Sequence, residues 1–537
     1  MTATGAQLRI GFASIYAWRP HVEHLHYLAT LARQAGHECR FLTCDADLAH
    51  CYTRELRDLR ADWQECLMCR VGGLRSYASE GVSSIGALHE PLLDVPAGAS
   101  EWAMSSAATL GRFESLADFQ SDAFKAQLDR LTPAIATTYR AARNWIARNR
   151  LDAVFVFNGR IDATRAVFEA ARDADIRVIS VERSWFGNGL QLLPDENCLG
   201  MGAIDAFVAQ WQDKPLTETQ ARTAASYIAR RFAGNNQTEW RAYNADAQQN
   251  DWPVQLGSTR RVLLLPGSLN ELWGHPDWQS NWPEPTAGYD AVMAHLGLTG
   301  ADVLLRCHPN WGEKIGKMDG RLAEAYYTQW AQARGITVIP STDRTSTMGL
   351  MAQADAVLLA SGTAGLEAGA LGKQIIATAP TFYRCADMQT DASSPQALQQ
   401  LSLLVAQDSA AQQSKALHLR RQTLRFCYTI AHRVAQFTAQ VRAQSGARYD
   451  YLEGADPQRL SELVQSGQLQ PDDAHCADDT AGEDRVIALV QSGDWAALAK
   501  PASTSAPSAM PTRHLVRRRW MFRPIDAIRN AMPVGDR

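Results

Sequence analysis

Short apolar runs alternate with segments of helical spacing from the start of the chain. Residues 7–18, QLRIGFASIYAW, have the composition of a buried strand that leads into a loop. Residues 22–37 carry apolar side chains at helical spacing, and residues 38–44 return to a strand pattern. A strand, a helix and a strand in this order form a βαβ unit, so the pattern predicts that a parallel sheet begins at the start of the chain.

The same alternation continues through the first half of the chain. It predicts a helix over 136–150, a strand over 151–159, a helix over 160–175 and a strand over 176–183. A helix over 218–234 closes this region, so we expect one α/β domain over residues 1–245.

A polar stretch over 244–259 has the composition of a linker, and a second cycle follows it. Strands are expected over 260–267, 301–309, 336–340, 355–361 and 373–379, with helices between them. Apolar strands that alternate with helices are typical of a sheet covered on both faces. The fold class is therefore α/β with two Rossmann-like domains, the second over 256–425, facing a ligand-binding cleft.

The pattern changes after a long helical stretch that ends near residue 445. The string LVQSG occurs at 463–467 and 489–493, which indicates a short helical repeat in an extension over 426–500. A flexible linker and a basic amphipathic tail are expected over 501–537. Five arginines between Arg513 and Arg523 surround a Trp-Met-Phe triplet, a mixture that favours contact with an anionic membrane or docking on the protein itself.

Composition narrows the class of protein. The chain of 537 residues is 46% apolar and 20% charged, as in ordinary globular proteins. A net charge of -4 argues against a nucleic-acid-binding protein, which carries a broad basic face. The first residues lack the layout of a signal peptide, and no apolar run approaches the ~20 residues of a membrane span, so a cytoplasmic location is expected.

Five of the ten cysteines lie between residues 39 and 69. Cys66 and Cys69 form a C-x-x-C pair, and Cys44 and Cys51 precede it without that spacing. Reduced, partly buried thiols are one interpretation, and a structural metal site built from these four cysteines is the other.

The sharpest local signal lies in DAVLLASGTAGLEAGALGKQII, residues 355–376. A strand delivers Ser361, Gly362 and Thr363 to the first turn of a helix, where free backbone N–H groups and hydroxyls suit an anion. Glu367, one turn later, is suitably placed to bind a sugar hydroxyl. A simple N-cap is the alternative interpretation of the serine and threonine.

A second helix start and a histidine complete the expected donor site. Thr345 and Ser346 begin a helix after one strand, and His308 ends another. Together these groups would surround a phosphate, with Arg306, Pro309 and Lys314 flanking the histidine; Lys314 could equally be solvated surface. The chain has no Walker loop, and it lacks an obvious D-x-D carboxylate pair at a strand end.

The first domain carries its own polar set at two strand ends. Asn158, Gly159 and Arg160 follow one strand, Arg165 lies on the next helix, and Glu182 and Arg183 end the next strand. Such side chains suit an anionic or sugar ligand, although salt bridges between domains would explain them as well.

These residues resemble a known family. The segments FNGR, VFEAARDADIRVISVER, RCHP and SGTAGLEAGALGKQII, in this order, are similar to the capsule-polysaccharide-biosynthesis family of bacterial glycosyltransferases. Within it the chain most resembles the retaining β-Kdo transferases, over roughly residues 8–425. The cysteine spacing is also similar to members of that group.

The resemblance implies a GT-B fold and a CMP-β-Kdo donor, with no metal or other cofactor required for transfer. Glu182 and His308–Pro309 match the family's Glu and His-Pro elements, and His308 would contact the donor phosphate. Retention of configuration calls for two displacements through a carboxylate nucleophile. Asp277 is the favoured candidate by position, with Glu271 as the alternative, and the acceptor would be a lipid-linked or free oligosaccharide.

Two other functions fit parts of the sequence. A GT-B transferase or epimerase that uses a UDP-sugar is one. A non-catalytic subunit of a polysaccharide assembly complex, with the LVQSG helices as docking elements, is the other.

Overall fold

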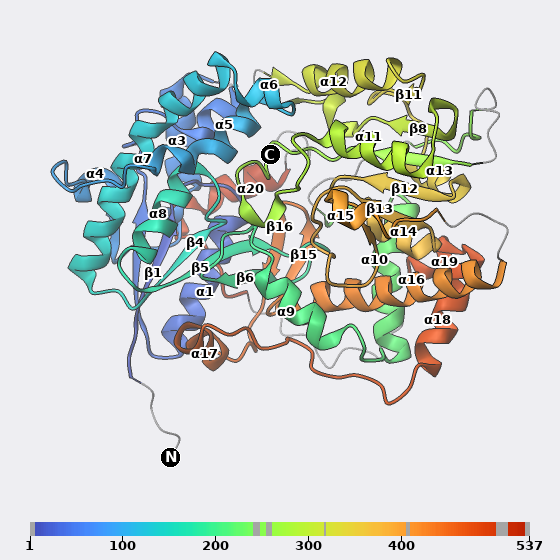
Figure 1. Cartoon of the computed structure of the whole chain (residues 1–537). Helices are drawn as coiled ribbons and strands as arrows, with labels where there is room; N and C mark the ends of the chain where they lie inside the picture. The colour runs from blue at the N-terminus through green and yellow to red at the C-terminus, as the bar shows by residue number, and fades with distance from the viewer. Residues whose placement is uncertain are drawn as a thin grey trace.

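The computed structural model describes residues 6–58, 60–239, 247–253, 260–315, 318–403, 409–500 and 514–531. Two six-stranded sheets organise the chain, one in each half of the view in Figure 1. The predicted α/β fold with two Rossmann-like domains is confirmed. The linker expected over 501–512 lies outside the described residues, and most of the linker over 244–259 does as well.

The first sheet has the strand order β3-β2-β1-β4-β5-β6. Its strands are β1 (Arg9–Ser14), β2 (Glu38–Thr43), β3 (Val82–Ser84), β4 (Ala153–Phe157), β5 (Arg177–Arg183) and β6 (Leu190–Pro194). All neighbours are parallel except β6, which runs antiparallel to β5 at the edge. Helices α1 (His21–Gln34), α7 (Asp122–Asn149) and α8 (Asp162–Arg172) pack around this sheet. The order reverses between β1 and β4, which is where ligands bind in such folds.

The second sheet repeats this order as β11-β8-β7-β12-β13-β14, with all strands parallel. Its strands are β7 (Val262–Leu265), β8 (Val303–Arg306), β11 (Thr337–Ile339), β12 (Ala356–Leu359), β13 (Gln374–Ala377) and β14 (Thr390–Asp391). Its helices are α11 (Pro285–Leu296), α12 (Arg321–Gln332), α13 (Thr347–Gln353) and α14 (Ala364–Leu371).

Alternate side chains of each strand explain why the second sheet is buried on both faces. Val262 and Leu264 of β7 join one apolar cluster with α11 and α12. Leu263 and Leu265 point the other way, into a cluster shared with α13 and α14. The near-continuous apolar runs seen in the sequence are the consequence of this two-sided burial.

The boundary between the domains differs from the expected residue 245. Helices α9 (Gly202–Trp211) and α10 (Glu218–Phe232) contribute their apolar residues to the cluster of the second domain. Helix α10 packs on α16 (Ser409–Thr429) and α18 (Ala481–Ser492). Sequence order placed α10 in the first domain, whereas its apolar face is buried against helices that follow much later in the chain.

The extension over 426–500 is shared by both domains. The hairpin of β15 (Val441–Ser445) and β16 (Arg448–Tyr451) and helix α17 (Gln458–Ser466) join the core of the first domain. Helix α18 joins the core of the second domain. Both copies of LVQSG end a helix, with Gly467 and Gly493 in the left-handed conformation that closes it.

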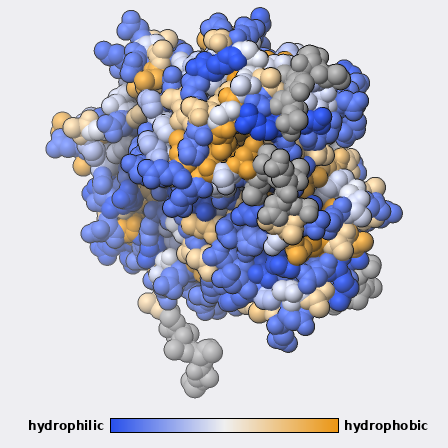
Figure 2. All heavy atoms as spheres, turned by 45° about the vertical axis from the view of Figure 1, so that its right-hand side comes forward, coloured by the Kyte–Doolittle hydropathy of each residue, from blue (hydrophilic) through white to orange (hydrophobic). Residues whose placement is uncertain are grey.

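The basic tail docks on the first domain, which is one of the two alternatives left open by the sequence. The backbone N–H of Leu515 donates to the carbonyl of Tyr451, and that of Arg519 donates to the carbonyl of Ser76. Helix α20 (Arg523–Ala531) follows. Among the described residues, no helix is long and apolar enough to cross a membrane. On the face shown in Figure 2, apolar residues gather near the middle and hydrophilic residues surround them.

Candidate active site

A cavity lies at the carboxyl ends of β8 and β12 in the second domain. It is lined by Arg231, Asn236, Glu239, Leu265, Pro266, Arg306, Cys307, His308, Pro309, Thr347, Met348, Met351, Thr363, Ala364 and Glu367. Five residues predicted for the donor site are therefore brought together here: Arg306, His308, Pro309, Thr363 and Glu367.

Local geometry fixes the orientation of His308. Its Nδ1 accepts a hydrogen bond from the backbone N–H of Asn310 at 3.2 Å, because His308 caps the short 3-10 helix that begins at Pro309. This bond uses one ring nitrogen and defines which side of the imidazole faces the cavity. The neighbouring Arg306 donates to the carbonyl oxygens of Pro340 and Asp343, so it also holds the loop after β11 in place.

Glu367 lies on the first turns of α14 and is paired with Arg231 from α10. Arg231 Nη1 donates to Glu367 Oε1 at 3.1 Å, while its Nε donates to both carboxylate oxygens of Glu239. Burial raises the pKa of Glu367, and the charge of Arg231 acts in the opposite direction. The second oxygen of Glu367, Oε2, is buried without a hydrogen-bond partner among the described residues.

The other residues predicted for the donor site lie outside the cavity lining. Ser346 caps α13 by accepting from the N–H of Gly349, and the hydroxyl of Thr345 accepts from Asn250. The carbonyl of Gly362 accepts from Tyr383 at 3.2 Å. Ser361 is buried against Gly267, and Lys314 is exposed on β9 (Lys314–Ile315). Ser346 thus acts as an N-cap, whereas Thr363, one of the two residues for which an N-cap was the alternative interpretation, makes no side-chain capping bond at the start of α14.

Arg160 is the centre of a second polar cluster, at the carboxyl ends of β4 and β5. It is half-buried, and its Nη1 donates to Ser105 Oγ at 2.6 Å. Burial lowers the pKa of Arg160. The nearby Glu271, Tyr52, Cys198 and Glu182 outweigh this effect and raise it. Burial also raises the pKa of Glu182, while Arg183, Arg160 and the side chain of Asn158 act in the opposite direction.

The predicted substrate-binding residues therefore fall into two groups. Asn158, Arg160, Glu182 and Arg183 are brought together, and His21 Nδ1 lies 3.5 Å from Glu182 Oε1. Gly159 adopts a φ of +63°, which allows the turn between β4 and α8. In contrast, Arg165 pairs with Glu169 one helical turn away and does not join the cluster.

Two residues near the end of α5 (Met104–Gly111) connect the domains at this site. The carboxylate of Glu114 accepts from Ser268 Oγ at 2.6 Å, from Leu269 N at 2.9 Å and from Asn270 Nδ2 at 3.1 Å. Burial raises the pKa of Glu114 to about 7. Arg112 donates to the backbone and side chain of Asn310, beside His308. The first domain thus holds both the loop after β7 and the His-Pro turn.

The two carboxylates proposed as nucleophile face different surroundings. Glu271 is exposed, and its charge contributes to the electrostatics of Arg160 and Cys198 in the first-domain cluster. Asp277 Oδ2 accepts from the backbone N–H of Met201 at the start of α9, and its carbonyl accepts from Arg384. Asp277 thus contributes to the start of α9, and neither Glu271 nor Asp277 is among the residues that line the cavity of the second domain.

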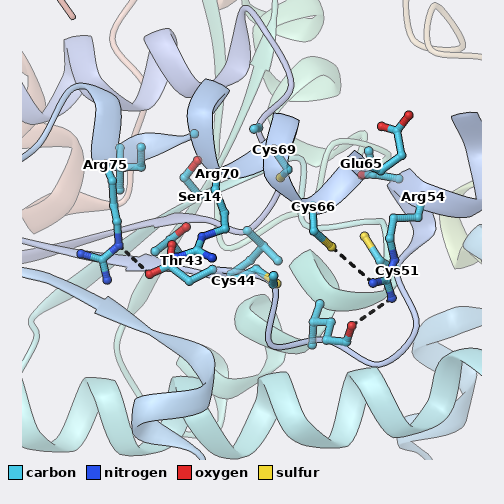
Figure 3. Close-up of a pocket in the computed structure, with 18 residues that line it drawn as sticks. Ser14, Thr43, Cys44, Cys51, Arg54, Glu65, Cys66, Cys69, Arg70 and Arg75 are labelled. Atoms are coloured by element: carbon cyan, nitrogen blue, oxygen red, sulfur yellow. Dashed lines mark hydrogen bonds and ion pairs between the residues drawn. The ribbon is translucent and has the colours of Figure 1, made fainter. Parts of the chain in front are cut away.

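The four clustered cysteines line a pocket beside β1 and β2. Figure 3 shows Cys66 and Cys69 on α3 (Asp62–Gly72), Cys44 after β2 and Cys51 before α2 (Tyr52–Arg57). Arg54 donates to Cys66 Sγ at 3.3 Å. Burial raises the pKa of Cys51 to about 12 and that of Cys69 to about 11. The described residues include no group of three or more His, Cys, Asp or Glu arranged to hold a metal ion. All four are free thiols.

The sequence did not single out several residues of the site. Arg231 of α10 and Glu239, which follows that helix, complete the cavity from a region assigned to the other domain. Arg112 and Glu114 come from a region without a clear pattern. The two opposite charges of Arg112 and Glu114, two residues apart in RFESL, were the available signal.

No protein-family profile matches this sequence, and no curated protein matches it. Solved structures, in contrast, are similar to this chain. The β-Kdo 2,4 transferase of Thermosulfurimonas dismutans KpsC is 14% identical, with 52% of this chain and 79% of that one covered and a TM-score of 0.32. The β-Kdo 2,7 transferase of the same protein is 11% identical, over 61% and 89%, with a TM-score of 0.33.

A UDP-GlcNAc 2-epimerase from Neisseria meningitidis, solved with UDP-GlcNAc bound, is similar as well. It is 10% identical, with 79% of this chain and 96% of that one covered and a TM-score of 0.26. These similarities concern the fold and assign no substrate to this chain.

Proposed function

We propose that this protein is a retaining glycosyltransferase that moves Kdo from CMP-β-Kdo to an oligosaccharide or lipid-linked oligosaccharide in lipopolysaccharide O-antigen or capsule synthesis. The observation that carries the proposal is the cavity of the second domain, where His308, the first turn of α14 and Glu367 converge. Free N–H groups at a helix N-terminus and an oriented histidine suit a single phosphate. Glu367 lines this cavity, and its carboxylate suits a ribose hydroxyl.

The chemistry divides into two displacements at the same carbon. In the first, a carboxylate oxygen of Glu271 attacks the anomeric carbon of Kdo while the bond from that carbon to the CMP phosphate oxygen breaks. CMP leaves with the electron pair, and a covalent sugar ester remains on Glu271. Two inversions in succession give net retention. Asp277, the candidate favoured by the sequence, is the alternative nucleophile.

In the second displacement, the hydroxyl of the acceptor attacks the same carbon and the ester bond to Glu271 breaks. The proton of that hydroxyl passes to Glu182. Burial raises the pKa of Glu182, and a base whose pKa lies closer to neutrality is better matched to this transfer. The positive charge of Arg160 offsets the repulsion between the carboxylates of Glu182 and Glu271.

Donor choice and turnover test this proposal separately. CMP is expected to raise the Tm of the protein and UDP is not, since a ligand that binds only the folded state stabilises it. CMP release from CMP-Kdo should then require a glycan acceptor, and Glu182→Gln should lower its rate. Stabilisation by UDP alone would instead indicate a UDP-sugar enzyme. A donor that binds without any turnover would indicate a non-catalytic subunit.

A further inference from the structure

Helix α3 presents three large apolar residues to solvent and buries one glutamate. Trp63 is 67% exposed, and Leu67 and Met68 are each 52% exposed on the same side of the helix. Glu65, by contrast, is only 2% exposed and pairs with Arg60 at 3.0 Å. Figure 3 shows that the inner side of α3 carries Cys66 and Cys69, which line the pocket beside β1 and β2.

A surface helix of a globular protein usually buries its apolar stripe, whereas α3 leaves Trp63, Leu67 and Met68 exposed. A buried glutamate and an exposed tryptophan on one short helix mean that packing within the chain does not explain the apolar side. Large exposed apolar groups that lie together mark a surface that meets a partner. The exposed side of α3 is therefore a candidate surface for binding a partner.

The C-terminal tail extends the same surface. Arg518 donates to the carbonyl of Val71, one helical turn beyond Leu67, and the backbone of Arg519 donates to Ser76. Trp520, which follows directly, is 75% exposed, and Ile528 of α20 is 65% exposed. We call the combined set the α3–tail face; it comprises Trp63, Leu67, Met68, Trp520, Met521, Ile525 and Ile528.

The tail part of the α3–tail face is strongly positive, although the whole chain has a net charge of -4. Residues 514–531 contain five arginines and one acidic residue, Asp526. That aspartate is already paired with Arg19 and Arg518. Within the part of the chain that the structure describes, the exposed side chains of Arg517 and Arg519 form no ion pair.

We propose that the α3–tail face docks on an anionic lipid bilayer. Tryptophan at the level of the headgroups, aliphatic side chains below it and arginines beside anionic lipids are the arrangement that holds interfacial helices in a membrane. Each arginine near an anionic surface contributes about 1 kcal/mol to binding. The proposal rests on the surface alone and does not depend on the transfer chemistry.

Co-sedimentation of the full chain with vesicles tests this proposal, without any donor present. The vesicles consist of phosphatidylcholine alone or mixed with phosphatidylglycerol. Wild type should bind the mixed vesicles and release them at high salt. The triple change Trp63→Ser, Leu67→Ser, Met68→Ser should weaken binding about tenfold or more. Arg517→Gln with Arg519→Gln should weaken it about fivefold for each arginine, on anionic vesicles only.

Leu322→Ser is the matched control, since Leu322 is 58% exposed on α12 in the other domain and should leave binding unchanged. Circular dichroism and thermal unfolding show that each variant is folded. Equal binding of wild type to both vesicle types would overturn the proposal. A dimer in light scattering that the triple variant dissociates would also overturn it, because a second copy would then cover the face.

Discussion

Arg112 of the first domain donates two hydrogen bonds to Asn310 of the second, at 2.8 Å to its carbonyl oxygen and 2.6 Å to its Oδ1. Asn310 also donates its backbone N–H to His308. The orientation of the histidine in the donor cavity is thus connected, through one asparagine, to an arginine of the opposite domain. Glu114, two residues after Arg112, makes a parallel connection to the loop before Glu271.

Replacement of Arg112 should loosen the His-Pro turn. In Arg112→Met, we expect faster amide hydrogen exchange in the peptide over 308–312 and turnover lowered about tenfold, because small misplacement of a binding group is costly. Arg222→Met, at an exposed arginine of α10, is the control and should change neither. Unchanged exchange in the 308–312 peptide of Arg112→Met would mean that the turn is held by its own domain.

Glu367 should contribute to donor affinity through its carboxylate. Glu367→Gln keeps the shape of the side chain but weakens its acceptor and its pair with Arg231, so we expect CMP to bind roughly tenfold more weakly. Isothermal titration with CMP measures this change. Glu218→Gln, on the exposed side of α10, should bind CMP like wild type. Equal affinity of both variants would remove Glu367 from the donor site.

Glu114 should make stability depend on pH. Its pKa rises from 4.5 to about 7 on folding because of burial, so the folded state binds the proton more tightly than the unfolded state. The free energy of unfolding therefore falls as pH rises from about 4.5 to 7, by about 3 kcal/mol from this group. Glu114→Gln lacks the titration, so urea unfolding should show the variant gaining stability relative to wild type between pH 5 and pH 8. A constant difference would contradict this account.

The pocket cysteines should react slowly. Burial raises the pKa of Cys51 to about 12 and of Cys69 to about 11, so little thiolate exists near pH 8. Cys476 is exposed. Peptide mapping after brief iodoacetamide treatment should find Cys476 modified first, and the Cys476→Ser variant should remove most of the fast modification. Rapid labelling of Cys51 or Cys69 would show that the pocket opens in solution.

The strands of both sheets were predictable because their side chains are buried in a regular way. Leu263 and Leu265 alternate with Val262 and Leu264 between two apolar clusters, and that burial leaves a direct trace in the sequence. The position of His308 and Glu367 at strand and helix ends followed from the same pattern.

Other parts of the site depend on tertiary contacts that no local pattern encodes. Arg231 enters the cavity because α10 packs on helices of the second domain, more than a hundred residues later. The choice between Glu271 and Asp277 depends on the path of one loop, in which Asp277 reaches the backbone of Met201 while Glu271 stays near Arg160. Short motifs do not fix the path of such a loop.

The most direct test is an intact mass spectrum of the protein after incubation with CMP-Kdo and no acceptor. We expect a covalent adduct of one Kdo, mapped to Glu271 by peptide sequencing. Glu271→Gln should form no adduct and lose turnover by several orders of magnitude. Asp277→Asn should keep the adduct and nearly all of its stability, because the amide oxygen of asparagine can still accept the bond from the backbone of Met201. An adduct on Asp277 would reassign the nucleophile, and turnover by wild type and by both variants without any adduct would contradict the double-displacement account.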